Sequence, residues 1–423
     1  MAGPLEGVRV IEFTEIIAGP VGGMLLADFG ADVIKVEPPW GDPWRGSPGP
    51  SGPNESRGFI SVNRGKRSIR VDLTKPAGKL VVHRLVADAD VVVLNHRPDV
   101  PAKLGIDYET LSAVNPRLIY CEVTAYGRRG PNQDLPGYDV IVQALSGMMT
   151  SEGHVEDGVP RAVSVSPVSD MATGYSIMMS VSAALYYRER TGKGQKIENS
   201  LLQNSLTMQG SALTQLDDFP TPGQIWRDED LPVLKEAGVE FQEIYAAYRG
   251  LRYNPEFRAY YRAYQTSDWV ISIGCLSSPL RKKMADAMGV HDIRFDPGYV
   301  RESAESVEFA ENLIKTYEKL FSEKTTAEWM SLLTAAGVPC GPMRFIEEMV
   351  YDEQALANGM VVETRHSVSG NTRGPGPLSV MSESPLEITR GAPAFGEHTR
   401  EVLLEAGYTE AEIEKLVEAA AVF

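Results

Sequence analysis

The chain begins with a strand–helix–strand pattern of apolar residues. Residues 8–13 and 31–37 are short apolar runs that predict strands. Residues 20–30 predict a helix between them, because proline is favoured in the first helical turn. Two strands joined by a helix are typical of a parallel sheet. The loop at residues 14–20 lacks the GxGxxG motif, which argues against binding of a nicotinamide nucleotide.

Strands and helices continue to alternate through the first half of the chain. Residues 38–53 are rich in proline and glycine and predict a loop. A long apolar helix is expected from about residue 171 to residue 190, because Thr-Gly-Lys-Gly follows as a stop signal. The other expected elements are strands at 68–72, 91–94 and 118–122 and helices at 77–87 and 108–115. This spacing predicts an α/β fold: a Rossmann-like large domain with a parallel sheet, over residues 1–214.

The pattern changes after residue 214. Residues 215–258 are rich in Trp, Tyr, Glu and Pro without a clear period, which favours a linker with helical pieces. Residues 259–336 predict a smaller α/β domain with a strand at 269–273. Residues 337–423 have short strands and then an acidic amphipathic helix, whose start is marked by a capping box of Thr409 and Glu412. We expect this last section to return to the large domain.

Composition narrows the class of protein. A length of 423 residues favours two domains, and 43% hydrophobic with 23% charged residues is typical of a globular protein. The net charge of −16 argues against nucleic acid as a partner, because phosphate binding needs a basic surface. The longest mostly apolar stretch, residues 174–187, is shorter than the roughly 20 residues of a membrane-spanning helix. We therefore expect no membrane association.

The cysteines and histidines indicate neither a disulfide framework nor a metal site. Cys121, Cys275 and Cys340 are far apart in the sequence, and no two of the six histidines have the spacing of metal ligands. Buried structural thiols are the simpler interpretation of Cys275 and Cys340. The first residues lack a basic segment followed by an apolar one, so no signal peptide is expected. Together these features predict a cytoplasmic protein.

Asp170 is the most informative candidate for chemistry. It stands in Ser-Pro-Val-Ser-Asp-Met-Ala-Thr-Gly, where a loop enters the long apolar helix. Aspartate is a favoured N-cap, so a structural role explains the residue by itself. A carboxylate shielded by apolar neighbours and stabilised by a helix N-terminus can also serve as an ionised nucleophile. The two interpretations are compatible.

Two further clusters lie at predicted element ends. Tyr138 and Asp139 precede Gln143, and Asp139 alone is most simply a surface or capping carboxylate. The second cluster directly follows the strand at 91–94, where open α/β sheets bind ligands. Its basic residues could hold a phosphate, although each could also be structural. The second cluster consists of Asn95, His96, Arg97 and Pro98, with Lys103 and Leu104 further on.

These segments together resemble the family III coenzyme A transferases, the group that contains formyl-CoA:oxalate transferase and the carnitine CoA-transferases. The resemblance covers nearly the whole chain except about residues 215–260. The matching stretches are GVRVIEFTEIIAGP, LLADFGADVIKVEPP, NHRP, KLGIDYETLSAVNPRLIYCEVTAYG, GYDVIVQALSGMM, DMATG, ALYYRERTGKGQKIENSL, GVPCGPM and GEHTREVLLEAGY.

The resemblance implies roles for particular residues. The family's catalytic aspartate falls on Asp170. The residues that it places in the coenzyme pocket are Ile16, Ile17, Asn95, His96, Lys103, Leu104 and Tyr138. Arg97 joins them as a cation beyond the same strand, or alternatively braces its loop. Acyl-CoA and small carboxylic acids would be the substrates, with no tightly bound cofactor and no metal, and the protein would form an interlocked homodimer.

Several positions depart from the formyl-CoA enzyme. That enzyme has Gln at the position of Ile17 and Arg near the position of Pro38. It also covers its intermediates with a glycine-rich loop, whereas the nearest candidate here, residues 272–278, contains a single glycine. These departures put oxalate in question as the acceptor and leave the reaction type intact.

The implied reaction proceeds through an aspartyl anhydride and an aspartyl-CoA thioester, both of which must be kept from water. An α-methylacyl-CoA racemase of the same fold is the alternative. Racemases have a histidine where this chain has Tyr138, and tyrosine is a poorer base at neutral pH. A non-catalytic acyl-CoA-binding protein is a further alternative. The sequence does not name the donor and acceptor acids.

Overall fold

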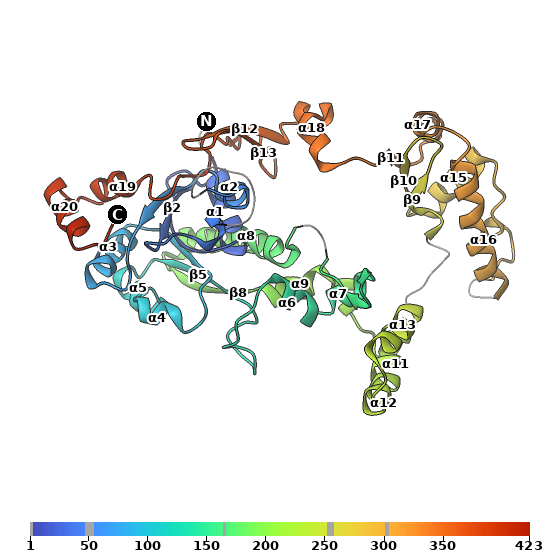
Figure 1. The fold of residues 1–423 in the computed structure, drawn as a ribbon, viewed down its shortest axis with the longest axis horizontal. Coiled ribbons are helices and arrows are strands. Elements are labelled where there is room, and N and C mark those ends of the chain that lie inside the picture. The colour runs from blue at the N-terminus through green and yellow to red at the C-terminus, as the bar shows by residue number, and fades with distance from the viewer. Residues whose placement is uncertain (1–2, 47–54, 164–165, 252–257, 301–303) are drawn as a thin grey trace. The chain divides into compact units, whose positions relative to one another are not determined.

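The computed structural model describes residues 3–46, 55–163, 166–251, 258–300 and 304–423. The chain divides into two compact units. Unit 1 comprises residues 1–217 and 353–423, and unit 2 comprises residues 218–352 (Figure 1). No helix among the described residues is long and apolar enough to cross a membrane.

Unit 1 is built on a six-stranded sheet in which every pair of neighbouring strands is parallel. The strand order is β3-β2-β1-β4-β5-β8, so the order reverses between β1 and β4. This is the order of the doubly wound Rossmann sheet, which confirms the predicted α/β class. The strands are β1 (Arg9–Phe13), β2 (Asp32–Glu37), β3 (Arg67–Arg70), β4 (Val91–Leu94), β5 (Ile119–Thr124) and β8 (Gln195–Ser200).

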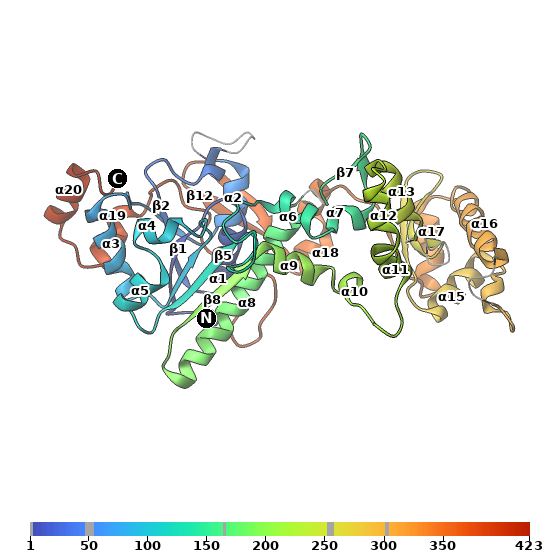
Figure 2. The same cartoon turned by 90° about the horizontal axis from the view of Figure 1, so that it is seen from below.

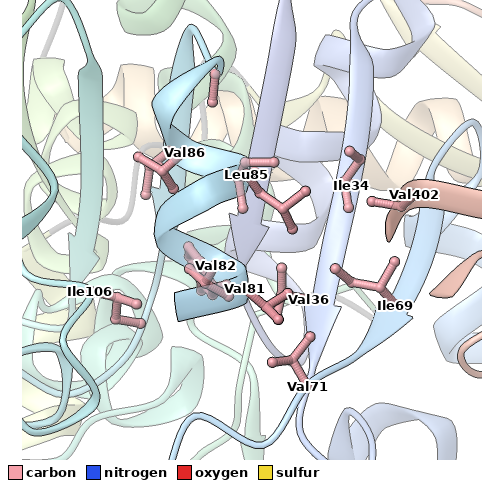
Figure 3. Packing of buried hydrophobic residues seen from close by; sticks show 14 of the residues in the cluster. Ile34, Val36, Ile69, Val71, Val81, Val82, Leu85, Val86, Ile106 and Val402 are labelled. Carbon is pink, nitrogen blue, oxygen red and sulfur yellow. The ribbon is translucent and has the colours of Figure 1, made fainter. Parts of the chain in front are cut away.

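Apolar residues on alternate positions of the strands bury both faces of this sheet. On one face, Ile34 and Ile69 pack with Leu85 and Val402 from helices (Figure 3). The helices on this face are α3 (Pro76–Ala87), α5 (Tyr108–Val114), α19 (Thr399–Glu405) and α20 (Glu410–Glu418). On the other face, Val33 packs in one core with residues of α1 (Ala18–Asp28) and α8 (Val168–Thr191). Burial on both faces explains why the central strand β4 is a continuous apolar run, Val-Val-Val-Leu.

Helices α1 and α8 pack closely because two glycines face large residues. A Cβ on Gly174 of α8 would lie 2.3 Å from a methyl carbon of Val21 on α1. A Cβ on Gly22 of α1 would lie 2.7 Å from the Ile177 side chain of α8. The long green helix α8 and α1 lie side by side in Figure 2. This contact fixes the start of α8 relative to the loop that follows β1.

The remaining elements of unit 1 are short. Residues 353–423 supply α18 (Glu353–Ala357), the hairpin of β12 (Val361–His366) and β13 (Gly370–Pro375), and the two helices named above. The capping box of Thr409 and Glu412 is present at the start of α20. The others are η1 (Pro43–Gly46), α2 (Arg57–Asn63), α4 (Val100–Leu104), α6 (Asp139–Leu145), α7 (Met148–Glu152), β6 (Val155–Glu156), β7 (Val159–Pro160), α9 (Leu201–Met208) and α10 (Gly210–Leu213).

Unit 2 has an antiparallel sheet in the order β11-β10-β9. Its core contains Tyr264, Tyr317 and Trp329, which are almost fully buried. The strands are β9 (Tyr261–Gln265), β10 (Val270–Gly274) and β11 (Cys340–Pro342). The helices are α11 (Pro222–Asp228), α12 (Asp230–Glu236), α13 (Phe241–Leu251), α15 (Ser278–Met288), η2 (Ile293–Phe295), α16 (Ala304–Phe321), α17 (Thr326–Ala335) and η3 (Ile346–Tyr351).

The described residues of the stretch without a clear period, 215–251 and 258, therefore contain the helices α11, α12 and α13, and unit 2 includes them. Proline, at position 222 in α11 and position 232 in α12, interrupts the helical spacing of apolar residues in this stretch. The chain returns to unit 1 at residue 353, whereas the sequence placed the return at 337. The predicted division into domains at residues 1–214, 215–258, 259–336 and 337–423 stays a prediction.

The candidate active site

A cleft of about 350 Å³ lies in unit 1 beyond the carboxyl ends of β1, β4, β5 and β8. It includes the point where the strand order reverses, which is the usual ligand site of such sheets. The predicted residues that line the cleft are Ile16, Ile17, Asn95, His96, Arg97, Tyr138 and Asp170. Residues of the predicted site from four separate segments thus meet in one place. Lys103 and Leu104 do not line this cleft.

Asp170 occupies the first turn of α8 and is 9% exposed. The prediction that it caps this helix is wrong, because Pro167 is the N-cap and Asp170 is the third helical residue. Asp139 caps the helix instead. Its Oδ1 accepts the backbone N–H groups of Ser169 at 2.7 Å and Asp170 at 3.2 Å. The capping role expected for Asp139 is therefore present, but it serves α8, thirty residues further along the chain.

Gln143 completes this cap. Its side-chain amide donates to Asp139 Oδ2, while its Oε1 accepts the backbone N–H of Val163 at 2.7 Å. In the described part of the chain, no hydrogen bond reaches the carboxylate oxygens of Asp170. Burial first and the negative charge of Asp139 second raise the pKa of Asp170 to about 7. The residue is thus an unusually basic carboxylate and not one that its surroundings stabilise as an anion.

The loop after β1 forms one wall of the cleft. Ile16 has a φ of 71°, a left-handed conformation that is rare for a β-branched residue. Its N–H donates to Asp42 Oδ1 at 3.1 Å. Asn95 holds the preceding residue, because its Oδ1 accepts the Glu15 N–H at 2.9 Å and its Nδ2 donates to the Glu15 carbonyl at 2.8 Å. The side-chain amide of Asn95 is therefore engaged with the protein itself.

Most of the predicted cations provide little charge to the cleft. Burial, with the nearby charge of Lys35, lowers the pKa of His96 to about 4, so this imidazole is neutral at pH 7. The side chain of Arg97 is 59% exposed and lies 3.7 Å from Asp99. Lys103, 70% exposed on α4, forms an ion pair of 2.6 Å with the same Asp99. A phosphate group would compete with Asp99 for both cations.

A second cavity of about 280 Å³ adjoins the cleft beyond the ends of β1 and β2. His96 and Glu15 line both cavities, and Leu104 lines only the second. Tyr138, which is the N-cap of α6, is 67% exposed at the edge of the cleft. Among the described residues, no group of three or more His, Cys, Asp or Glu side chains could hold a metal ion.

Some lining residues were missed by reasoning from the sequence. Ala125 and Leu201 directly follow β5 and β8, so their position at strand ends was an available signal. Gln133 and Leu135 come from the loop after β5, for which the sequence offers no comparable signal. Glu15 is a second carboxylate in the cleft, and burial raises its pKa, with Asp42 contributing less.

A parallel Rossmann-like sheet with a buried carboxyl group at its switch point defines an α/β enzyme with a cleft for a ligand. Comparison with known proteins identifies the family. The model of CoA-transferase family III matches residues 5–399, so the chain belongs to this family. The chain is 34% identical over 416 residues to succinyl-CoA:glutarate CoA-transferase of Mus musculus, covering 98% of this chain and 89% of that protein. It is 32% identical to acetyl-CoA:oxalate CoA-transferase of Acetobacter aceti, covering 93% and 94%.

Solved structures agree with this assignment. The Rv3272 protein of Mycobacterium tuberculosis has a TM-score of 0.74 and 29% identity, covering 94% of this chain and 98% of that one. A CAIB/BAIF family protein from Brucella suis has a TM-score of 0.72 and 29% identity, covering 96% and 100%. The expected resemblance to the family III enzymes is confirmed, and the chain is an enzyme of the CoA-transferase class.

Proposed function

We propose that this enzyme moves coenzyme A from an acyl-CoA donor to a carboxylic acid, with Asp170 as the covalent nucleophile. The observation that carries the proposal is a nearly buried carboxyl group in the first turn of α8, in the cleft beyond the strand ends. A poorly solvated carboxylate with a pKa near 7 is a stronger nucleophile than a hydrated one with the usual value of 3.8.

Four exchanges complete the reaction. The Asp170 carboxylate attacks the donor thioester carbonyl, the C–S bond breaks, and an acyl-aspartyl anhydride and CoA thiolate form. The thiolate attacks the aspartyl carbonyl, expels the donor acid as a carboxylate, and leaves an aspartyl-CoA thioester. The acceptor carboxylate then attacks this thioester to give a second anhydride and thiolate. Attack of the thiolate on the acceptor carbonyl releases the new acyl-CoA and regenerates Asp170.

Each exchange converts one activated acyl group into another, so protons and electrons balance without a further reactant. Water is the competing nucleophile at every intermediate. Apolar side chains of Ile16, Ile17 and Leu201 line the cleft with Asp170 and support the exclusion of water. The coenzyme is a substrate that binds and leaves during turnover and is not a resident cofactor.

For coenzyme recognition we propose the residues of the two cavities, with Arg97 and Lys103 as the phosphate-binding cations. Both side chains are mostly exposed and are held by a single carboxylate, Asp99. Exposed ion pairs are weak, so phosphates can displace this carboxylate at little cost. Asn95 is different, because its polar groups already bind the backbone of Glu15.

Racemisation at the carbon next to the thioester remains the alternative. That reaction needs two groups that exchange a proton with this carbon. Tyr138 is mostly exposed, and Asp139 already accepts hydrogen bonds from two backbone N–H groups and from Gln143. Neither side chain is therefore a suitable base, which favours transfer. Little deuterium uptake from heavy water into a 2-methylacyl-CoA would agree with transfer, whereas rapid uptake without an acceptor acid would favour racemisation.

We also propose a homodimer in the cytoplasm. Tyr175, Met179 and Tyr186 are spaced along one side of α8 and are 44%, 71% and 67% exposed, so an apolar stripe of this helix is open for a second copy. Cys121, Cys275 and Cys340 are unpaired thiols, which suits a reducing compartment.

The test of the nucleophile is a covalent adduct. The native protein and Asp170→Ala are each mixed with succinyl-CoA or acetyl-CoA and analysed by intact mass, with glutarate and oxalate as acceptors in parallel turnover assays. We expect an acyl or CoA adduct and transfer with the native protein only, and a cooperative thermal unfolding transition that shows that the variant is folded. Substantial transfer by Asp170→Ala would refute the role of Asp170, and the absence of any turnover would favour a protein that only binds acyl-CoA.

A further inference from the structure

The loop between β1 and α1 adopts a conformation that its own sequence does not favour. Ile16 has positive φ, which costs a non-glycine residue about 1–3 kcal/mol and most of all a β-branched one. Such a conformation persists only where the surrounding structure holds it. Ile16 and Ile17 both line the cleft beside Asp170. In an extended strand the side chains of Ile16 and Ile17 would point to opposite sides, so the turn is what lets both line the cleft.

Three side chains hold this turn in place. Lys35 Nζ donates to the Thr14 carbonyl at 2.6 Å, and the Asn95 amide binds both the N–H and the carbonyl of Glu15. Asp42 accepts the N–H of Ile16 through one oxygen and pairs with Lys35 at 3.0 Å through the other. Lys35 and Asp42 are buried, at 0% and 2% exposed.

These bonds engage consecutive backbone groups, from the Thr14 carbonyl to the Ile16 N–H. The clamping side chains come from β2, from the loop after β2 and from the loop after β4. The turn leads directly into α1, whose fourth residue, Val21, contacts Gly174 of α8, one helical turn beyond Asp170. The clamp therefore fixes the apolar wall of the cleft relative to the reactive carboxyl group.

We propose that Asn95 and Asp42 are positioning residues that hold the Glu15–Ile17 turn against Asp170, so that water is kept from the acylated aspartate. This inference rests on the proposed function, because it concerns the partition of that intermediate between transfer and hydrolysis. Asn95 acts through the turn and not through contact with the coenzyme. Loss of either polar contact releases the strain at Ile16, and the apolar wall moves away from Asp170.

The test compares two asparagines that bind backbone groups in unit 1. Asn95→Ala removes both bonds to Glu15. Asn115→Ala is the matched control, because Asn115 binds the carbonyls of Val86 and Ala89 and the N–H of Arg117, away from the cleft. The substrates are whichever of succinyl-CoA with glutarate or acetyl-CoA with oxalate the native full-length protein transfers faster. Free CoA formed without the new acyl-CoA measures hydrolysis, and thermal unfolding is recorded for each variant.

We expect Asn95→Ala to raise the ratio of hydrolysis to transfer about tenfold, which corresponds to about 1.4 kcal/mol between the two barriers. Asn115→Ala should unfold at a lower temperature and keep the native ratio. If Asn95→Ala fails to fold, Asn95→Asp retains the acceptor for the Glu15 N–H and should show a smaller increase. A native ratio of hydrolysis to transfer in the folded Asn95 variant would overturn the inference and leave the proposed function intact. Absence of both adduct and transfer in the native protein would instead refute the proposed function.

A second measurement isolates the strain at Ile16. Glycine adopts positive φ freely, so Ile16→Gly removes the strain. Asp42→Ala should lose more unfolding free energy in the Ile16→Gly background than in the native one, because only the native turn recovers strain when it relaxes. Equal losses in both backgrounds would show that Asp42 does not hold this conformation.

Discussion

Replacement of Asp139 by Asn tests how the cap of α8 controls the nucleophile. Asp139 stabilises the start of this helix through two backbone N–H groups, and its charge raises the pKa of Asp170. Asparagine is nearly isosteric and retains one oxygen for the Ser169 N–H. Its amide would face the amide of Gln143, so one hydrogen bond is lost, at a cost of about 1 kcal/mol in stability. The charge is removed, and the pKa of Asp170 should fall.

The magnitude follows from the pKa of about 7. At that value about a tenth of Asp170 is ionised at pH 6 and about nine-tenths at pH 8. If attack needs the carboxylate, kcat/KM of the native enzyme should rise about tenfold across this range. Burial, the larger cause of the raised pKa, persists in Asp139→Asn. The acid limb should therefore move to lower pH, and the gain at pH 6 relative to pH 8 is at most about tenfold.

The assay is the pH dependence of kcat/KM between pH 5 and pH 9, with the donor and acceptor that the native enzyme uses best. Asp107→Asn is the matched control, because Asp107 caps α5 through the Thr110 N–H and lies outside the cleft. It should lose a comparable amount of stability without moving the acid limb. An acid limb that stays in place in a folded Asp139→Asn protein would contradict the electrostatic role of Asp139.

Three further changes probe the same unit. Asp170→Asn should stabilise the protein above pH 7 and leave it unchanged near pH 4. Its folded pKa of about 7 exceeds the ordinary 3.8, so ionisation costs about 4 kcal/mol once both states have lost the proton, measured by denaturant unfolding at pH 4 and pH 8. Lys103→Ala should raise KM for the acyl-CoA severalfold with kcat little changed, whereas Lys282→Ala, another exposed lysine paired with Asp286 four residues on, should leave both unchanged in steady-state kinetics. Gly174→Ala should destabilise by about 1–3 kcal/mol in thermal or denaturant unfolding, because its Cβ would meet Val21 at 2.3 Å.

Local pattern was sufficient for five of the six strands of the sheet, but it missed β8, whose residues Gln195–Ser200 are mostly polar. The strand predicted at residues 91–94 is β4 itself, because four consecutive apolar residues follow Asp90 and both faces of the strand are buried. The helix predicted from residue 20 begins at Ala18, since the rule placed proline at the first position. Pro20 is the third helical residue, where its missing N–H still costs no hydrogen bond. The predicted start of a helix is therefore uncertain by a residue or two, because proline fits at more than one position of the first helical turn.

Contacts between distant residues were beyond the sequence. Nothing local indicates that Asp139 caps a helix that begins at Val168, because the pairing depends on how α6 packs against α8. The left-handed Ile16 is likewise disfavoured by its own residue type and is held by side chains at positions 42 and 95. Residues brought together by strand order, such as Asn95 and Asp170, were predictable as a group but not in their individual roles.

The charge state of Asp170 links the cap to the reaction. From the sequence, the helix N-terminus should stabilise this carboxylate, yet the available N–H groups of Ser169 and Asp170 are bound to Asp139. The resting carboxylate is therefore buried, next to a negative charge and without donors from the described residues. An anhydride or thioester at Asp170 is neutral, so acylation removes both the desolvation cost and the repulsion. The same surroundings that raise the pKa of the free acid thus favour the covalent intermediates, and the apolar wall held by Asn95 and Asp42 would then decide whether they react with the acceptor or with water.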